Sequence, residues 1–209
     1  MTRGILLALA GARPDTKHTN DLACVVKQLC KLHIEATVMV QSESAFGMIK
    51  SQLTGEPCSG VALTWMPLLP PNVSAGRHGR VLRKNARDVL QWRHFKVSAI
   101  QRCPYSETLY LDNDVWLRNA SRLLGWFDRL GNRTLISGRR TPAGVTPGLD
   151  TPQVPSSFPE INSGTLFLRC PQSRLITDNW RTYLETKGHN SLGRDQKALR
   201  IAMYEQRAR

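Results

Sequence analysis

The sequence predicts one domain of three layers, in which helices cover both faces of a mostly parallel β-sheet (an α/β/α arrangement). Short apolar or β-branched segments alternate along the chain with segments whose apolar residues recur every three or four positions. This alternation is typical of such a fold. The chain has 209 residues, of which 41% are hydrophobic, and that is enough for one sizeable core. We therefore expect residues 1–209 to form a single domain.

Each predicted element follows from a local pattern. Strands are expected where short runs are apolar or β-branched, and helices where longer segments carry apolar residues on one face. The expected strands are residues 4–10, 34–40, 61–65, 108–111, 134–137 and 160–168. The expected helices are residues 22–32, 44–53, 81–102, 120–130, 172–186 and 194–206. Residues 139–159 are rich in proline, glycine and threonine, which predicts a long loop that serves as a lid or a binding segment.

The first apolar run superficially resembles the core of a secretion signal, because residues 4–10 follow Arg3. The run is short, however, and Arg13-Pro14-Asp15 stands where a cleavage site of small residues is expected. A first strand is the better interpretation. No apolar run reaches the ~20 residues that span a bilayer, so no transmembrane segment is expected.

The chain is strongly basic, with a formal net charge of +13 and a pI near 10.2. Such a charge suggests nucleic-acid binding, but the basic residues are scattered. The aromatic residues are few and are not interleaved with the basic cluster at Arg77–Arg87. A basic surface suits a diphosphate-bearing substrate equally well. We expect no nucleic-acid partner and keep a basic nucleic-acid-binding domain as an alternative.

The five cysteines show neither a CxxC pair nor the spacing of zinc ligands. Their odd number and apolar neighbours predict reduced, mostly buried thiols, which favours a cytoplasmic location without establishing it. Three sequons for N-glycosylation begin at Asn72, Asn119 and Asn132. They matter only in a secreted chain, so we interpret them as chance matches.

The most informative segment is Leu109-Tyr110-Leu111-Asp112-Asn113-Asp114-Val115-Trp116, an apolar run that leads into two carboxylates. In open α/β sheets, ligands bind outside the carboxyl ends of the strands. Two carboxylates at that position suit Mg²⁺ or Mn²⁺, which binds through one or two carboxylates together with substrate phosphates. The alternative is a turn at a strand end with two solvated aspartates.

Three further features accompany these carboxylates. Asn162-Ser163-Gly164 interrupts a strand-like run, and glycine there permits close approach of a ligand. Asp195 stands at the start of a predicted helix, near its positive end. Lys96 precedes the two aspartates on another helix. The alternatives are a turn residue for Asn162, a helix N-cap for Asp195 and a solvated helix face for Lys96.

In order and spacing, these segments resemble nucleotide-sugar glycosyltransferases of the GT-A fold, especially the glycogenin-like and related retaining families. That pattern runs lysine, "sPy…tLYLDxDvw", "fNSGvllfr" and a helix that begins Asp-Gln. Here it appears as Lys96, the two segments 103–116 and 161–169, and Asp195-Gln196. The resemblance covers residues 96–200 and implies a GT-A-like, Rossmann-like form of the predicted α/β fold.

The resemblance also implies an activity and a site. A Mn²⁺ or Mg²⁺ ion would be held by Asp114, with Asp112 contacting the metal or the ribose of the donor. The ion would neutralise the diphosphate of a nucleotide-sugar donor, with a UDP-sugar favoured. Lys96 or an arginine near it would add positive charge at the phosphates. Asn162 and Gly164 would line the sugar pocket, and Asp195 would contact the sugar or an acceptor hydroxyl. Asp195 and Asn162 are thus the catalytic candidates. The acceptor, whether saccharide, protein or lipid, is not identified by the sequence.

Two departures from the pattern and three rival functions stay open. Related families supply a metal-binding histidine after the Asp-Gln helix, whereas this sequence ends at Arg209, which leaves His189 or water. Residues 11–19 lack the first nucleotide-contact motif. The rivals are a haloacid-dehalogenase-like phosphohydrolase, the basic domain named above, and a glycosyltransferase fragment that binds donor but turns over poorly. The phosphohydrolase lacks its second pair of metal-binding acidic residues here.

Overall fold

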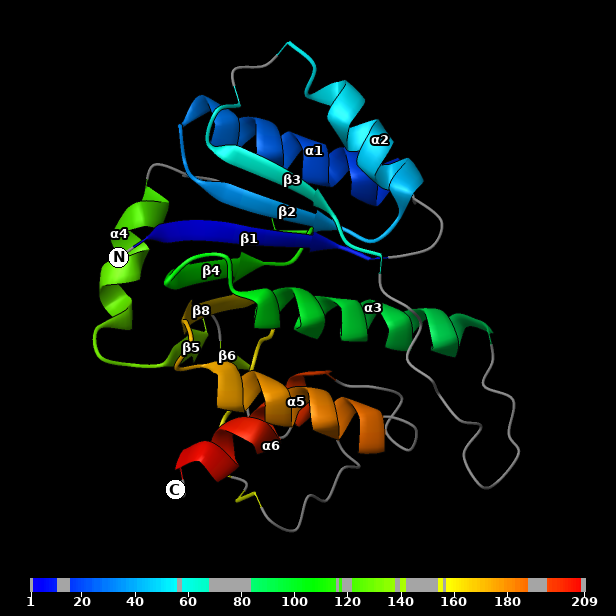
Figure 1. The fold of residues 1–209 in the computed structure, drawn as a ribbon. Helices are drawn as coiled ribbons and strands as arrows, with labels where there is room; N and C mark the ends of the chain where they lie inside the picture. The colour runs from blue at the N-terminus through cyan, green and yellow to red at the C-terminus, as the bar shows by residue number, and fades with distance from the viewer. Residues whose placement is uncertain are drawn as a thin grey trace.

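The computed structural model describes residues 2–10, 16–55, 58–67, 84–115, 117, 122–137, 140–141, 154–155, 157–187 and 195–207. Its centre is a six-stranded sheet of order β3-β2-β1-β4-β8-β5 (Figure 1). The strands are β1 Arg3–Leu9, β2 Ala36–Val40, β3 Val61–Trp65, β4 Glu107–Leu111, β5 Leu135–Ser137 and β8 Thr165–Arg169. Of these six strands, β8 runs in the direction opposite to the other five. A separate pair joins β6 Arg140–Thr141 to β7 Glu160–Ile161.

Helices cover both faces of the sheet (Figure 1). On one side lie α1 Thr16–Lys31 and α2 Glu43–Gln52, and on the other α3 Lys84–Arg102, α5 Arg174–Lys187 and α6 Asp195–Arg207. The central strand β1 is buried on both faces: Ile5 and Leu7 belong to the first core, Leu6 and Ala8 to the second. This alternation follows from the two-residue period of a strand, and it explains why β1 is a continuous apolar run. The predicted α/β/α fold and the first strand are confirmed.

Three predicted elements differ from the structure. Helix α1 begins at Thr16 and not near residue 22. The single strand expected at 160–168 is divided into β7 and β8 by a turn at 162–164. The helix expected at 120–130 is reduced to α4, Leu123–Phe127, and a 3₁₀ turn, Asp128–Leu130. Most of the predicted loop at 139–159 lies outside the described residues.

The expectation of reduced thiols is wrong for four of the five cysteines. Disulfides join Cys30 to Cys58 and Cys103 to Cys170, with Cα–Cα distances of 4.6 and 6.1 Å, and Cys24 is an exposed free thiol. The sequence did not reveal the pairs because folding brings together residues 28 and 67 positions apart. Disulfides are typical of oxidising compartments, so the cysteines no longer favour the cytoplasm. Within the described part of the chain, no helix is long and apolar enough to cross a membrane.

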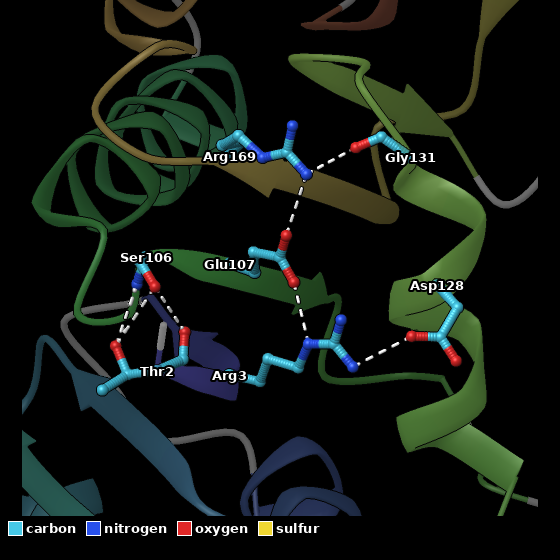
Figure 2. A network of polar contacts seen from close by, with 7 residues as sticks. All are labelled: Thr2, Arg3, Ser106, Glu107, Asp128, Gly131 and Arg169. Atoms are coloured by element: carbon cyan, nitrogen blue, oxygen red, sulfur yellow. Dashed lines mark hydrogen bonds and ion pairs between the residues drawn. The ribbon is translucent and has the colours of Figure 1, made fainter.

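The buried carboxylate of Glu107 links side chains at the amino ends of β1 and β4 and at the carboxyl end of β8 (Figure 2). Glu107, the first residue of β4, accepts hydrogen bonds from Arg3 Nε at 2.8 Å and from Arg169 Nη2 at 2.9 Å. Arg3 also donates to Asp128 at 3.0 Å. Burial by itself raises the pKa of Glu107, but the hydrogen bonds from Arg169 and Arg3 outweigh it, so that its pKa is lowered. The ionised carboxylate therefore stabilises the junction of β1, β4 and β8.

We expect Glu107→Gln to lower the free energy of unfolding at neutral pH by about 1–2 kcal/mol, since hydrogen bonds to charged groups are lost. A lowered pKa contributes stability above the ordinary pKa of a glutamate, and this contribution disappears as pH falls through the lower value. The difference between the native protein and the variant should therefore shrink below about pH 4. Urea unfolding from pH 7 to pH 3 measures it. The control is Glu185→Gln in the exposed pair with Arg181, where a loss of at most about 0.5 kcal/mol is expected. Equal losses in both variants would contradict this role of Glu107.

Candidate functional site

Asp112 stands directly after β4, at the carboxyl end of that strand. Its backbone N–H donates to the carbonyl of Gly164 at 2.8 Å, which joins the end of β4 to the turn before β8. The side chain of Asp112 is 17% exposed, and Asp114 is exposed. The carboxylate of Asp112 is therefore mostly buried, whereas that of Asp114 is exposed to solvent.

Lys96 belongs to α3 and is only 1% exposed. The alternative that it lies on a solvated face of this helix is therefore wrong. Its Nζ lies 2.9 Å from Asp112 Oδ1 and 3.3 Å from Asp195 Oδ2. The rings of Trp92 and Tyr110 lie 5.1 and 5.3 Å from the same ammonium group, close enough for cation–π attraction. One buried cation thus lies between two carboxylates that are 83 residues apart in the sequence.

Ser163 completes this network. Its hydroxyl accepts a hydrogen bond from Lys96 Nζ at 3.0 Å and donates one to Asp195 Oδ2 at 2.6 Å. The backbone carbonyl of Asp195 accepts from the indole of Trp180 at 2.9 Å, which anchors the first turn of α6. The carboxylate of Asp195 is therefore engaged by side chains of α3 and of the turn before β8.

The buried groups change each other's acidity. Burial raises the pKa of Asp112, and the attraction of Lys96 and the hydrogen bond from Tyr110 offset this only in part. Burial, with the neighbouring charge of Asp112, also raises the pKa of Tyr110 well above its ordinary value. The phenol consequently stays protonated and donates to Asp112 Oδ1 at 2.7 Å. These contacts orient one carboxylate oxygen before any ligand arrives.

Asn162 and Gly164 form the turn that brings the chain close to Asp112. The amide oxygen of Asn162 accepts a hydrogen bond from the backbone N–H of Gly164 at 2.8 Å, as the turn interpretation of Asn162 predicted. A Cβ on Gly164 would lie 2.6 Å from Asp112 Oδ2, closer than real Cβ contacts allow. Glycine is therefore required here for the close approach of a carboxylate from the protein itself. Contact of either residue with a sugar stays a prediction.

We expect Gly164→Ala to displace the Asp112 carboxylate and to destabilise the fold by about 1–3 kcal/mol through overpacking. Ligand binding at the site should fall with it. The matched control is Gly47→Ala in α2, where a Cβ meets nothing within 4 Å. That variant should gain up to about 1 kcal/mol, because alanine favours a helix over glycine. Thermal unfolding of both variants measures the contrast, and an undisturbed Gly164→Ala protein would show that the contact is loose.

The two aspartates suit a divalent cation of the hard type. Such a cation binds one or two carboxylates and completes its shell with water and substrate phosphates. Asp112 and Asp114 offer these oxygens at one strand end. Within the described ranges, no group of three or more His, Cys, Asp and Glu side chains is arranged so that it could hold a metal ion. His189, the further ligand considered from the sequence, lies outside them.

Two residues of the site, Ser163 and Tyr110, have no role that the sequence predicts. Ser163 belongs to the Asn-Ser-Gly motif, but no pattern indicates that it connects Lys96 to Asp195. Tyr110 was detectable, since strand alternation places it on the same face as Asp112. The sequence also predicts a role for an arginine near Lys96 without naming it. Arg93 precedes Lys96 by three residues on a helix, and its Nε lies 4.0 Å from Asp195 Oδ1.

A surface pocket lies near the amino end of strand β4. It is formed by the end of α3, the segment before β4 and the segment after β8, with Arg102, Tyr105 and Arg174 among its lining residues. These segments adjoin the amino end of β4, whereas Asp112 follows its carboxyl end. This pocket is therefore separate from the carboxylate site.

A mostly parallel α/β sheet with paired carboxylates after strand β4 defines the class: the chain has the fold of GT-A glycosyltransferases. No family model and no curated protein matches the sequence, but solved structures match the fold. Two are of LgtC: an active-site mutant (15% identity, TM-score 0.62) and a galactosyltransferase complex with donor and acceptor sugar analogues (16%, 0.59). Each match covers 96% of this chain and 70% of LgtC. The bifunctional glycosyltransferase WbbM matches with 12% identity and TM-score 0.53, over 88% of this chain and 35% of WbbM.

Proposed function

We propose that this protein is a glycosyltransferase that moves a sugar from a nucleotide-diphosphate sugar to an acceptor hydroxyl, with the help of Mn²⁺ or Mg²⁺. The observation that carries the proposal is the cluster of Asp112, Lys96, Ser163 and Asp195 at the end of β4. It lies in a fold shared with solved glycosyltransferases. The fold resemblance supports sugar transfer over phosphohydrolysis or nucleic-acid binding.

The charges of the cluster support a role for the aspartates in holding the donor. Two acidic side chains by themselves repel a diphosphate, so a cation between them and the phosphates is needed. When bound, the metal would act as a Lewis acid that stabilises the departing nucleoside diphosphate. Asp114 is exposed and Asp112 is pre-oriented by Tyr110 and Gly164. We assign the metal to both carboxylates and a UDP-sugar as the favoured donor.

Lys96 acts first on the two carboxylates in this proposal. Its observed contacts are carboxylates and a hydroxyl, so its first role is to neutralise Asp112 and Asp195 and to bridge them. For Lys96 to contact the donor phosphates as well, its ammonium group would have to divide its hydrogen bonds between these groups and the phosphates. Asp195, which accepts a hydrogen bond from Ser163, would orient a sugar or acceptor hydroxyl. Asn162 and Gly164 would form the wall of the sugar pocket.

Thermal unfolding with a panel of UDP- and GDP-sugars, each with Mn²⁺ and with EDTA, tests the proposal. A ligand at about a hundred times its dissociation constant stabilises by about 2.7 kcal/mol, a melting shift of roughly 5–10 °C for a chain of this size. We expect such a shift for one nucleotide sugar in Mn²⁺ and its loss in EDTA.

Three outcomes would contradict the proposal in different ways. A shift that persists in EDTA would keep donor binding and remove the metal. No shift with any donor, beside binding to nucleic acid that weakens steeply with salt, would favour the basic-domain alternative. Donor binding without release of nucleoside diphosphate in the presence of a panel of acceptors would indicate a donor-binding fragment.

A further inference from the structure

We propose that Asn132 is an N-linked glycosylation site and that the chain folds in an oxidising compartment that glycosylates proteins. The inference rests on two observations that the proposed function does not use. The first is the pair of disulfides, Cys30–Cys58 and Cys103–Cys170. The second is an exposed acceptor sequon, Asn132-Arg133-Thr134.

The disulfides change the meaning of the sequon. Both pairs link residues far apart in the sequence, and their Cα–Cα distances of 4.6 and 6.1 Å lie in the range that a disulfide requires. Disulfides persist in secretory compartments and are rare in the reducing cytosol. Asparagine glycosylation takes place in the same secretory route. A sequon that is a chance match in a cytosolic protein becomes a candidate acceptor in this one.

The position of Asn132 suits a bulky, solvated modification. Asn132 is exposed, in a turn between the 3₁₀ turn Asp128–Leu130 and β5. Backbone hydrogen bonds hold this turn on both sides, from Arg133 N to Leu130 O and from Arg169 N to Thr134 O. A glycan on Asn132 would therefore leave the backbone contacts of the turn in place.

A glycan at this turn would also leave the candidate donor site open. The preceding Gly131 accepts a hydrogen bond from Arg169, which also binds Glu107 at the first residue of β4 (Figure 2). The register agrees, because Leu135 pairs with Leu168, and Leu168 pairs with Thr108. Asp112 follows the last residue of β4, four residues beyond Thr108, which is roughly 13 Å along the strand at about 3.3 Å per residue. The modification and the proposed chemistry would therefore lie at opposite ends of the strands.

The covalent step needs a lipid-diphosphate-linked oligosaccharide and a transferase of the compartment. A bond forms between Nδ2 of Asn132 and C1 of the first sugar, and the bond between C1 and the diphosphate oxygen breaks. The amide proton leaves with the lipid diphosphate, so no oxidant or reductant is consumed. The hydroxyl of Thr134 completes the sequon that the transferase recognises.

The test is to express the full chain behind a cleavable secretion leader in a eukaryotic cell and to map its peptides. In a background with Asn72→Gln and Asn119→Gln, we expect one glycan on the Asn132 peptide. A peptide N-glycosidase should remove it and leave an aspartate. Asn132→Gln and Thr134→Ala should each abolish the glycan, whereas Thr134→Ser, which preserves the sequon, should retain it. Melting curves show that each variant is folded.

Thiol labelling tests the compartment independently. In protein from its own cells, alkylation before reduction should label Cys24 alone, and after reduction it should also label the four cysteines of the two disulfides. Folded, secreted protein without a glycan on Asn132 would overturn the proposal, as would native protein whose five cysteines are all alkylated without reduction. Neither result depends on whether the protein transfers sugars.

Discussion

Replacing Lys96 with methionine is expected to lower the free energy of unfolding by about 3 kcal/mol or more. Methionine preserves most of the volume but removes the ammonium group that lies between Asp112 and Asp195. Breaking a buried ion pair costs about 3–5 kcal/mol, because an uncompensated charge is left inside the protein. We expect a melting temperature lower by roughly 6–12 °C, together with loss of donor binding.

The control for this variant is Lys50→Met, which removes an exposed lysine of a helix and should change stability by at most about 0.5 kcal/mol. Adding Asp112→Asn to Lys96→Met should restore part of the stability, since one of the two unpaired charges is gone. Residues in one network show coupling of about 0.5–3 kcal/mol. Strictly additive losses in the double variant would mean that Lys96 does not neutralise Asp112.

Replacing Asp114 with asparagine is expected to reduce metal-dependent transfer by about a hundredfold or more while the fold stays intact. Asp114 is exposed, so the loss of its charge should change stability by at most about 0.5 kcal/mol. Removing one group that stabilises developing charge costs about 10²–10³ in rate. The measurements are turnover with the donor found by thermal unfolding and the Mn²⁺ concentration that gives half of the donor-induced melting shift.

Asp178→Asn is the matched control, because Asp178 is an exposed aspartate on α5 with a side chain 51% exposed. It should leave turnover and the Mn²⁺ dependence unchanged. A folded Asp114→Asn protein with full turnover and an unchanged Mn²⁺ requirement would remove Asp114 from the metal site. The same variant with lost turnover but an unchanged Mn²⁺ requirement would assign Asp114 to the substrate instead.

Local patterns predicted the elements wherever a single physical signal dominated. Strand β3 has the bounds that were predicted, Val61–Trp65, because a glycine precedes and prolines follow a short β-favouring run. The prediction was wrong at 160–168, where the amide oxygen of Asn162 accepts the N–H of Gly164 and turns the chain. Side chains that hydrogen-bond to the nearby backbone compete with strand pairing, and apolar periodicity does not detect them.

The cysteines show the same limit over longer distances. Nothing in the spacing of Cys103 and Cys170 indicates a pair, since the two residues meet only because β8 runs antiparallel to β4. The predicted reduced state followed from counting residues in a sequence whose pairing depends on the topology. Whether two cysteines can pair depends on the distance between them, and the fold of the chain sets that distance.

The sequence by itself determined the alternation of strands and helices and the placement of Asp112 and Asp114 after a buried strand. These features depend on neighbours within a few residues. Only the tertiary structure decided that Lys96 is buried, that Ser163 joins it to Asp195, and that four cysteines pair. Each of these depends on the packing of α3, β4, β8 and α6 against one another. Burial and electrostatic pairing are properties of that packing, and one strand or helix read alone does not contain them.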